Sequence, residues 1–183
     1  MIDHNKKLIC IHIARTGGTS IEYALCGDDW WNIEPETKHL SGKQTREFYG
    51  EEIWNSYTKF SVVRNPWDRL VSMWSTGWWH QADLTKDVSL DDFIKLIKPH
   101  QHETYNSIYY NQILNEDLNF ILRFETLQHD FSSMLQNIGL RDIVLPHYEM
   151  RHHKNYREMF DKKNELLVGE MFKMDILKYG YKF

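Results

Sequence analysis

A short polar loop with two adjacent glycines joins an apolar run to a helical pattern near the start of the chain. The first amides of a helix have no acceptor within the helix, and the helix dipole makes that end partly positive. Glycines at such a junction let the backbone approach a bound anion, and an arginine adds a full charge. An ordinary strand-to-helix turn would use the same residue types. The residues that we expect to contact the anion are Arg15, Thr16, Gly17, Gly18, Thr19 and Ser20.

A second strand-to-helix junction also places a charged side chain at a strand end. The segment FSVVRNPWDRLVSMW (residues 60–74) would deliver Arg64 at the carboxyl end of a buried strand. Asn65 and Pro66 then predict a helix start, with asparagine as the cap and proline in the first helical position. Ser72 lies two turns into that helix. Because a guanidinium binds phosphate through two hydrogen bonds, Arg64 and Ser72 predict a second anion site. Alternatively, Arg64 forms a structural ion pair and Ser72 is a surface hydroxyl.

The elements that must position these residues alternate between strands and helices. Buried strands are expected at residues 7–13 and 59–63, and a third, short strand is expected at residues 119–123. Helices are expected from a cap at Thr19 or Ser20 to Gly27, and at about residues 43–50, 66–78, 90–97, 127–138 and 163–178. This alternation predicts an α/β fold with three layers and a parallel central sheet, and ligands bind beyond the carboxyl ends of such strands. The absence of repeats or linkers predicts one domain over residues 1–183.

Composition narrows the classes of function. The chain has 22 basic and 26 acidic residues, a formal charge of −4, which argues against a nucleic-acid binder. Two cysteines, Cys10 and Cys26, are too few for a disulfide framework. No apolar stretch predicts a membrane helix, and residues 1–7 do not resemble a signal peptide. We therefore expect a cytoplasmic protein, or one of the Golgi lumen if a targeting segment has been trimmed away. The sequence does not predict an oligomeric state.

Both junctions resemble the motifs of one family, the sulfotransferases that use 3′-phosphoadenosine 5′-phosphosulfate (PAPS). HIARTGGTS is similar to that family's 5′-phosphosulfate loop, and VVRNPWDRLVS is similar to its 3′-phosphate motif. FILRFETLQHDF (residues 120–131) and DILKYGYKF (residues 175–183) also resemble the family. The likeness spans nearly the whole chain, in the family's order. It is greatest with the branch that contains carbohydrate sulfotransferases, such as the heparan and chondroitin enzymes.

The resemblance implies roles for both motifs and a phosphoadenosine product, PAP. Residues 16–20 would wrap the 5′-phosphate, and Arg64 and Ser72 would hold the 3′-phosphate. Arg15 stands where the family usually has lysine, near the bridging oxygen. Arginine keeps the charge but cannot readily donate a proton, so we expect it to stabilise the leaving phosphate. No metal is implied. Arg151 and Lys154, in a basic segment, would cover the nucleotide or meet an anionic acceptor, unless that segment is a solvated loop.

Sulfuryl transfer would run in line and needs a base for the acceptor hydroxyl. The family places its base between the two phosphate motifs, and His39 is the histidine in that interval. We therefore predict His39 as the base, with Glu34 and Glu36 as alternatives; His39 could instead be a surface residue. Trp78 and Trp79, at a helix end, could line the acceptor cleft, because aromatic faces suit sugar rings and phenols.

The predicted acceptor is a hydroxyl compound, or an amine, and a carbohydrate or another small molecule fits. Two other functions stay open. An ATP-dependent kinase would need a phosphate loop with lysine before threonine, whereas Gly18 is followed directly by Thr19. A PAP-binding module without activity is the second alternative, since Arg15 replaces the usual lysine.

Overall fold

A four-stranded sheet forms the centre of the computed structural model, which describes residues 1–76, 88–97, 108–146 and 155–183. The strands are β1 (Ile2–Asp3), β2 (Leu8–Ile11), β3 (Thr58–Val63) and β4 (Phe120–Arg123), and they lie side by side in that order. β2, β3 and β4 are parallel, and their register aligns Cys10, Phe60 and Phe120. The three predicted parallel strands are therefore present. The short antiparallel strand β1 was not predicted from the sequence.

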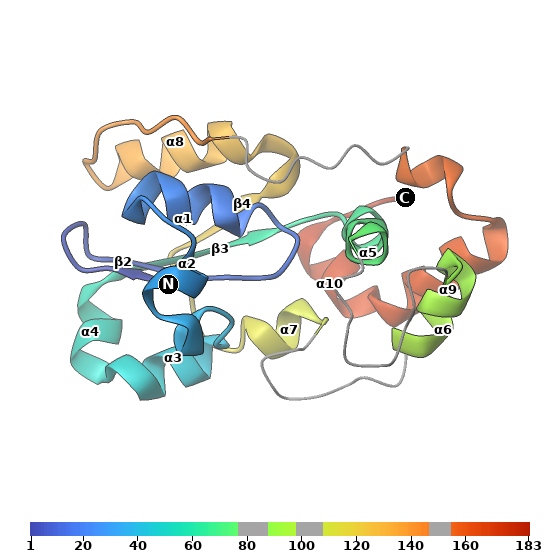
Figure 1. The fold of residues 1–183 in the computed structure, drawn as a ribbon, viewed down its shortest axis with the longest axis horizontal. Coiled ribbons are helices and arrows are strands. Elements are labelled where there is room, and N and C mark those ends of the chain that lie inside the picture. The colour runs from blue at the N-terminus through green and yellow to red at the C-terminus, as the bar shows by residue number, and fades with distance from the viewer. Residues whose placement is uncertain (77–87, 98–107, 147–154) are drawn as a thin grey trace.

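Helices cover both faces of the sheet, as the sequence predicted for a three-layer α/β fold. They are α1 (Gly18–Cys26), α2 (Trp30–Ile33), α3 (Gly42–Tyr49), α4 (Glu51–Ser56), α5 (Pro66–Ser75), α6 (Leu90–Ile97), α7 (Tyr110–Ile113), α8 (Leu127–Asn137), α9 (Lys162–Met171) and α10 (Lys173–Tyr179). Figure 1 shows α1 and α8 on one side of the sheet and α3, α4 and α7 on the other. Helices α5, α6, α9 and α10 gather beyond one end of the sheet (Figure 1). None of the described helices is long and apolar enough to cross a bilayer.

Two apolar clusters hold these layers together. The first lies around the sheet, where Ile11 of β2 and Phe60 of β3 are fully buried against Ile21 of α1 and Phe131 of α8. The second lies around α5 and includes Leu70. The second phosphate motif therefore has its strand in one cluster and its helix in the other, so the position of α5 depends on both.

The C-terminal helix differs from the sequence prediction. One helix over residues 163–178 was expected, but the chain breaks at Phe172 into α9 and α10. Met174 and Leu177 consequently face solvent, at 68% and 70% exposure. The break turns Asp175 inward, where its carboxylate accepts hydrogen bonds from the backbone amides of residues 110 and 111 at 2.9 and 3.2 Å. A buried carboxylate that satisfies two amides favours this turn over a continuous helix.

Candidate active site

The glycine-rich loop turns sharply from β2 into α1. Gly17 caps the helix in the left-handed region, with φ of +86°, and Arg15 has a φ of +66°. Helix α1 begins at Gly18, so the predicted cap at Thr19 or Ser20 is wrong, because the left-handed glycine makes the turn earlier. Both hydroxyl residues lie in the first helical turn and are half-buried.

The glycine-rich loop is fixed by a hydrogen bond to the preceding strand end, and its two glycines have no room for a side chain. The Thr16 hydroxyl is buried and donates a 2.7 Å hydrogen bond to the Ile13 carbonyl, which fastens the turn. A Cβ on Gly17 would lie 2.7 Å from the Leu127 side chain. A Cβ on Gly18 would lie 2.5 Å from Nε2 of His12. The glycines therefore let the loop lie directly against these side chains, where a larger residue would clash.

The second junction follows the sequence prediction closely. Asn65 caps α5 by accepting hydrogen bonds from the amides of Trp67 and Asp68 at 3.1 and 3.4 Å, and Pro66 is the first helical residue. Arg64 is buried, and its guanidinium lies 4.0 Å from the centre of the Phe124 ring. Its Nε donates to the Asp68 carboxylate at 2.7 Å. Arg64 thus forms the structural ion pair that the sequence left open.

Direct contacts join the two junctions. Nη1 of Arg64 donates to the Arg15 carbonyl at 3.1 Å, and Nε of Arg15 donates to the Ser72 hydroxyl at 3.1 Å. Two segments that are about 50 residues apart in sequence therefore meet at one edge of the sheet, where β2 and β3 end. A guanidinium and a hydroxyl from the second junction lie beside the first.

Arg69 is a residue of this site that the sequence analysis missed. It is 3% exposed, and its guanidinium donates to the carbonyls of Ala14 and Ile108 at 3.0 and 2.6 Å. Arg64 and Arg69 therefore bind the carbonyls of two consecutive loop residues, Ala14 and Arg15. A buried guanidinium needs several acceptors, and those of Arg69 come from other segments, so no local sequence pattern pointed to it.

His39 lies against the strand end that leads into the loop. Its Nδ1 is 3.4 Å from the His12 carbonyl, and the centres of the two histidine rings are 4.8 Å apart. His39 is 8% exposed, so it is not the surface residue that the sequence left as an alternative. Burial and, next, the neighbouring His12 lower the pKa of His39 to about 3. The ring is therefore neutral at pH 7.

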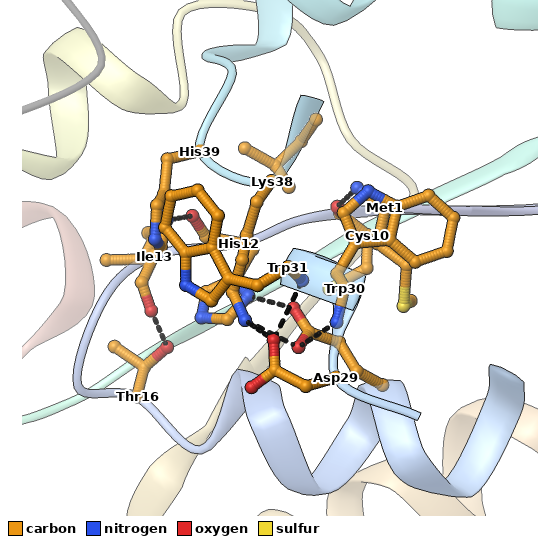
Figure 2. A network of polar contacts seen from close by, with 12 residues as sticks. Met1, Cys10, His12, Ile13, Thr16, Asp29, Trp30, Trp31, Lys38 and His39 are labelled. Atoms are coloured by element: carbon orange, nitrogen blue, oxygen red, sulfur yellow. Dashed lines mark hydrogen bonds and ion pairs between the residues drawn. The ribbon is translucent and has the colours of Figure 1, made fainter. Parts of the chain in front are cut away.

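A buried network of charges lies beneath the two histidines (Figure 2). The Glu22 carboxylate contacts His12 Nδ1, and it accepts hydrogen bonds from Lys38 Nζ at 2.9 Å and from the Trp30 amide at 3.1 Å. Lys38 also donates to Asp29 at 2.5 Å. Burial alone would raise the pKa of Glu22, but the bonds from His12 and Lys38 outweigh it and hold the pKa at about 2. Burial lowers the pKa of His12. None of this network was predicted from the sequence.

The remaining predicted residues are placed differently. The Glu34 carboxylate accepts hydrogen bonds from the Tyr49 and Thr37 hydroxyls, while Glu36 is exposed. Trp78, Trp79, Arg151 and Lys154 lie outside the described residues. Across the described residues, no group of three or more His, Cys, Asp or Glu side chains could hold a metal ion.

Comparison with known proteins agrees with this geometry. The model of the sulfotransferase family matches residues 1–182, which is all but the last residue of the chain. No curated protein and no solved structure gives a significant match. The family match, over a chain whose two phosphate motifs meet at one sheet edge, leads to a single assignment: the chain belongs to the sulfotransferase family and is a PAPS-dependent sulfotransferase.

Proposed function

We propose that the whole chain, as one domain, moves the sulfuryl group of PAPS to an acceptor hydroxyl, with His39 as the base. The 3.1 Å contact of Arg64 with the Arg15 carbonyl is the main support for the proposal, because it brings the two motifs close enough for one ligand to reach both. The loop from Arg15 to Ser20 would bind the 5′-phosphosulfate. Arg64 and Ser72 would bind the 3′-phosphate. The two glycines, at positions where a Cβ would clash with Leu127 and His12, support a close-packed loop whose backbone amides would meet the anion.

The contact of His39 with the His12 carbonyl supports its role as a base. The His12 carbonyl can only accept, so Nδ1 of His39 carries the proton and Nε2 carries the lone pair. Nε2 would take the proton of the acceptor hydroxyl while the acceptor oxygen forms a bond to sulfur. The bond from sulfur to the bridging oxygen breaks, and its electron pair stays on the phosphate of PAP.

Charge then develops on the leaving phosphate, and groups of the loop lie where they would stabilise it. These are the guanidinium of Arg15 and the first amides of α1, whose helix dipole favours negative charge. Arg15 is held by its bond to Ser72, so its charge is oriented before the nucleotide binds. No step in this scheme calls for a metal ion.

Nucleotide binding is tested by thermal unfolding of the full chain with PAP, ATP or AMP, each with and without magnesium. PAP should raise the melting temperature most, and without metal. Arg64→Lys keeps the charge but loses the planar fork, so it should weaken the PAP effect, whereas the exposed Arg141→Lys should not. A larger, magnesium-dependent effect of ATP would favour a kinase instead.

Transfer is tested with labelled PAPS and a panel of hydroxyl acceptors. His39→Ala should abolish transfer and preserve the PAP effect on melting, while the exposed control His129→Ala should change neither. Full activity of His39→Ala would disprove the base assignment. If the unaltered chain binds PAP but sulfates no acceptor, the alternative of a PAP-binding module without activity is the better description.

A further inference from the structure

An exposed tryptophan stands beside the candidate base. Trp31 is 45% exposed, and the centre of its ring lies 5.5 Å from the centre of the His39 ring, with the two planes at 67°. Its neighbour Trp30 is 3% exposed and donates to the Thr37 hydroxyl at 2.8 Å. Burial explains Trp30 as a core residue. It does not explain why a large apolar ring faces solvent next to His39.

Trp31 is held on a fixed turn. Its amide donates to the Asp29 carboxylate at 2.8 Å, and the adjacent Trp30 amide binds Glu22. Lys38 joins the same two carboxylates, and its Nζ lies 5.4 Å from the centre of the Trp31 ring. Helix α2 and the turn that carries His39 are therefore fastened to α1 by one network, so the two rings keep their relative position. Figure 2 shows both rings beside that network.

The surroundings of Trp31 are acidic. Residues 28–36 carry four carboxylates and no lysine or arginine. The charge of Lys38 is neutralised by two carboxylates, buried Glu22 and partly exposed Asp29. The next basic residues, Lys43 and Arg46, are each opposed by glutamate carboxylates. A polyanionic acceptor would meet unfavourable charge on this side of His39, whereas an uncharged acceptor would not.

We propose that Trp31 is the stacking surface for the acceptor, and that the acceptor is an uncharged ring compound bearing a hydroxyl group. This inference rests on the proposed function and names its substrate class. A ring stacked on the exposed indole face would lie beside His39, because the two protein rings are 5.5 Å apart, and one of its hydroxyls would face Nε2. Neutral sugars and phenols share this chemistry, since both present a flat apolar face with a hydroxyl at its edge. A polyanionic glycosaminoglycan does not.

Three probes and three variants test the proposal. The probes are cellobiose, 2-naphthol and unsulfated chondroitin, which represent a neutral sugar, a phenol and a polyanion. The variants are Trp31→Ala, Trp31→Phe and Phe48→Ala; Phe48 is an aromatic residue of α3 that is 54% exposed. Transfer from labelled PAPS gives KM and kcat, and calorimetry gives the affinity of each probe for the PAP-saturated chain.

At least one of the two neutral probes should be bound and sulfated in preference to chondroitin. Trp31→Ala should raise its KM and Kd about three- to tenfold, the range expected for loss of one aromatic contact. Trp31→Phe should recover most of that loss, Phe48→Ala should have no effect, and PAP should stabilise all variants equally. Comparison of cellobiose with 2-naphthol shows whether the neutral ring of the acceptor is a sugar or a phenol.

Preference for chondroitin, or a KM and Kd that Trp31→Ala leaves unchanged, would overturn the proposal. Failure of the proposed function has a different signature. If the chain binds a neutral probe through Trp31 but transfers no sulfuryl group, the stacking role of Trp31 is supported and the proposed transfer reaction is wrong. If neither neutral probe binds the PAP-saturated chain, the stacking surface is wrong even when another acceptor is sulfated.

Discussion

Replacing Lys38 by methionine should destabilise the chain more than most single substitutions do. Lys38 and Glu22 expose 3% and 1% of their side chains, and their charged atoms are 2.9 Å apart. Methionine fills most of the same volume but leaves the carboxylate with one cationic partner fewer. Removing one partner of a buried ion pair costs about 3–5 kcal/mol, chiefly because the other charge stays buried. His12 and the Trp30 amide still contact Glu22, so we expect a loss of about 3 kcal/mol.

Such a loss is a large part of the total stability, which is about 5–15 kcal/mol for a natural domain. For a chain of this length, about 3 kcal/mol lowers the melting temperature by roughly 6–12 °C. Urea unfolding followed by circular dichroism measures the free energy, and a thermal scan measures the temperature. Lys43→Met is the control: its ammonium lies 4.0 Å from Glu47 and both side chains are about two-thirds exposed, so its loss should stay under about 0.5 kcal/mol.

A double-mutant cycle separates the unpaired charge from lost packing. Adding Glu22→Gln to Lys38→Met removes the buried charge, so the double variant should be more stable than the sum of the single losses predicts, by about 1–3 kcal/mol. Because Lys38 precedes His39, Lys38→Met should also lower kcat while PAP still binds. A loss below about 1 kcal/mol for Lys38→Met, or additive single losses, would refute the argument that this network holds the turn of His39.

Three further outcomes follow from the same geometry. Burial lowers the pKa of His39 from 6.5 to about 3, so below pH 6.5 the unfolded chain binds a proton that the folded chain does not. His39 should therefore lower the stability by about 1–2 kcal/mol between pH 6.5 and pH 5, and His39→Phe should reduce the pH dependence in urea unfolding, while buried His12 keeps part of it. Gly18→Ala places a Cβ 2.5 Å from the His12 ring, so it should lower the free energy of unfolding by about 1–3 kcal/mol and abolish the rise in melting temperature caused by PAP. Gly169→Ala, whose Cβ would lie 3.4 Å from its nearest neighbour, should be tolerated in the same thermal scan. Asn65→Ala removes the cap of α5 and should lower the free energy of unfolding by about 1–2 kcal/mol. It should also weaken the PAP binding measured by calorimetry. An unchanged PAP affinity would show that the cap does not position the nucleotide site.

Local patterns were enough to predict the parallel strands and the second junction. The apolar run LICI of β2 is buried along its whole length, and β3 is buried in five of its six residues; the assignment of such segments to strands does not depend on distant partners. Asn65 and Pro66 specify a helix start by their own chemistry. The Asn65 side chain accepts hydrogen bonds from the free amides of the first turn, and Pro66 has no amide proton that would need an acceptor. The family motifs likewise lie in short continuous segments, which is why the resemblance to the sulfotransferase family could be recognised from the sequence.

Residues far apart in the chain decided the rest of the site. Lys38 reads as an ordinary surface lysine in TKHLSGKQ, and only the fold brings it to Glu22 and removes both from water. Arg69 acquires its acceptors at Ala14 and Ile108 from other segments. The break at Phe172 similarly depends on Asp175 meeting amides about 65 residues earlier. Periodicity within a segment cannot supply these partners.

The sequence by itself determined which segments would form the parallel strands and which two strand-to-helix junctions carry the family's motifs. Only the tertiary structure decided what surrounds the candidate base: His39 is buried beside His12, and Trp31, not its neighbour Trp30, faces solvent next to it. The physical reason is the range of the forces concerned. Backbone hydrogen bonding and apolar spacing act over a few residues, whereas desolvation, the pairing of buried charges and the exposure of a ring are properties of the packed chain.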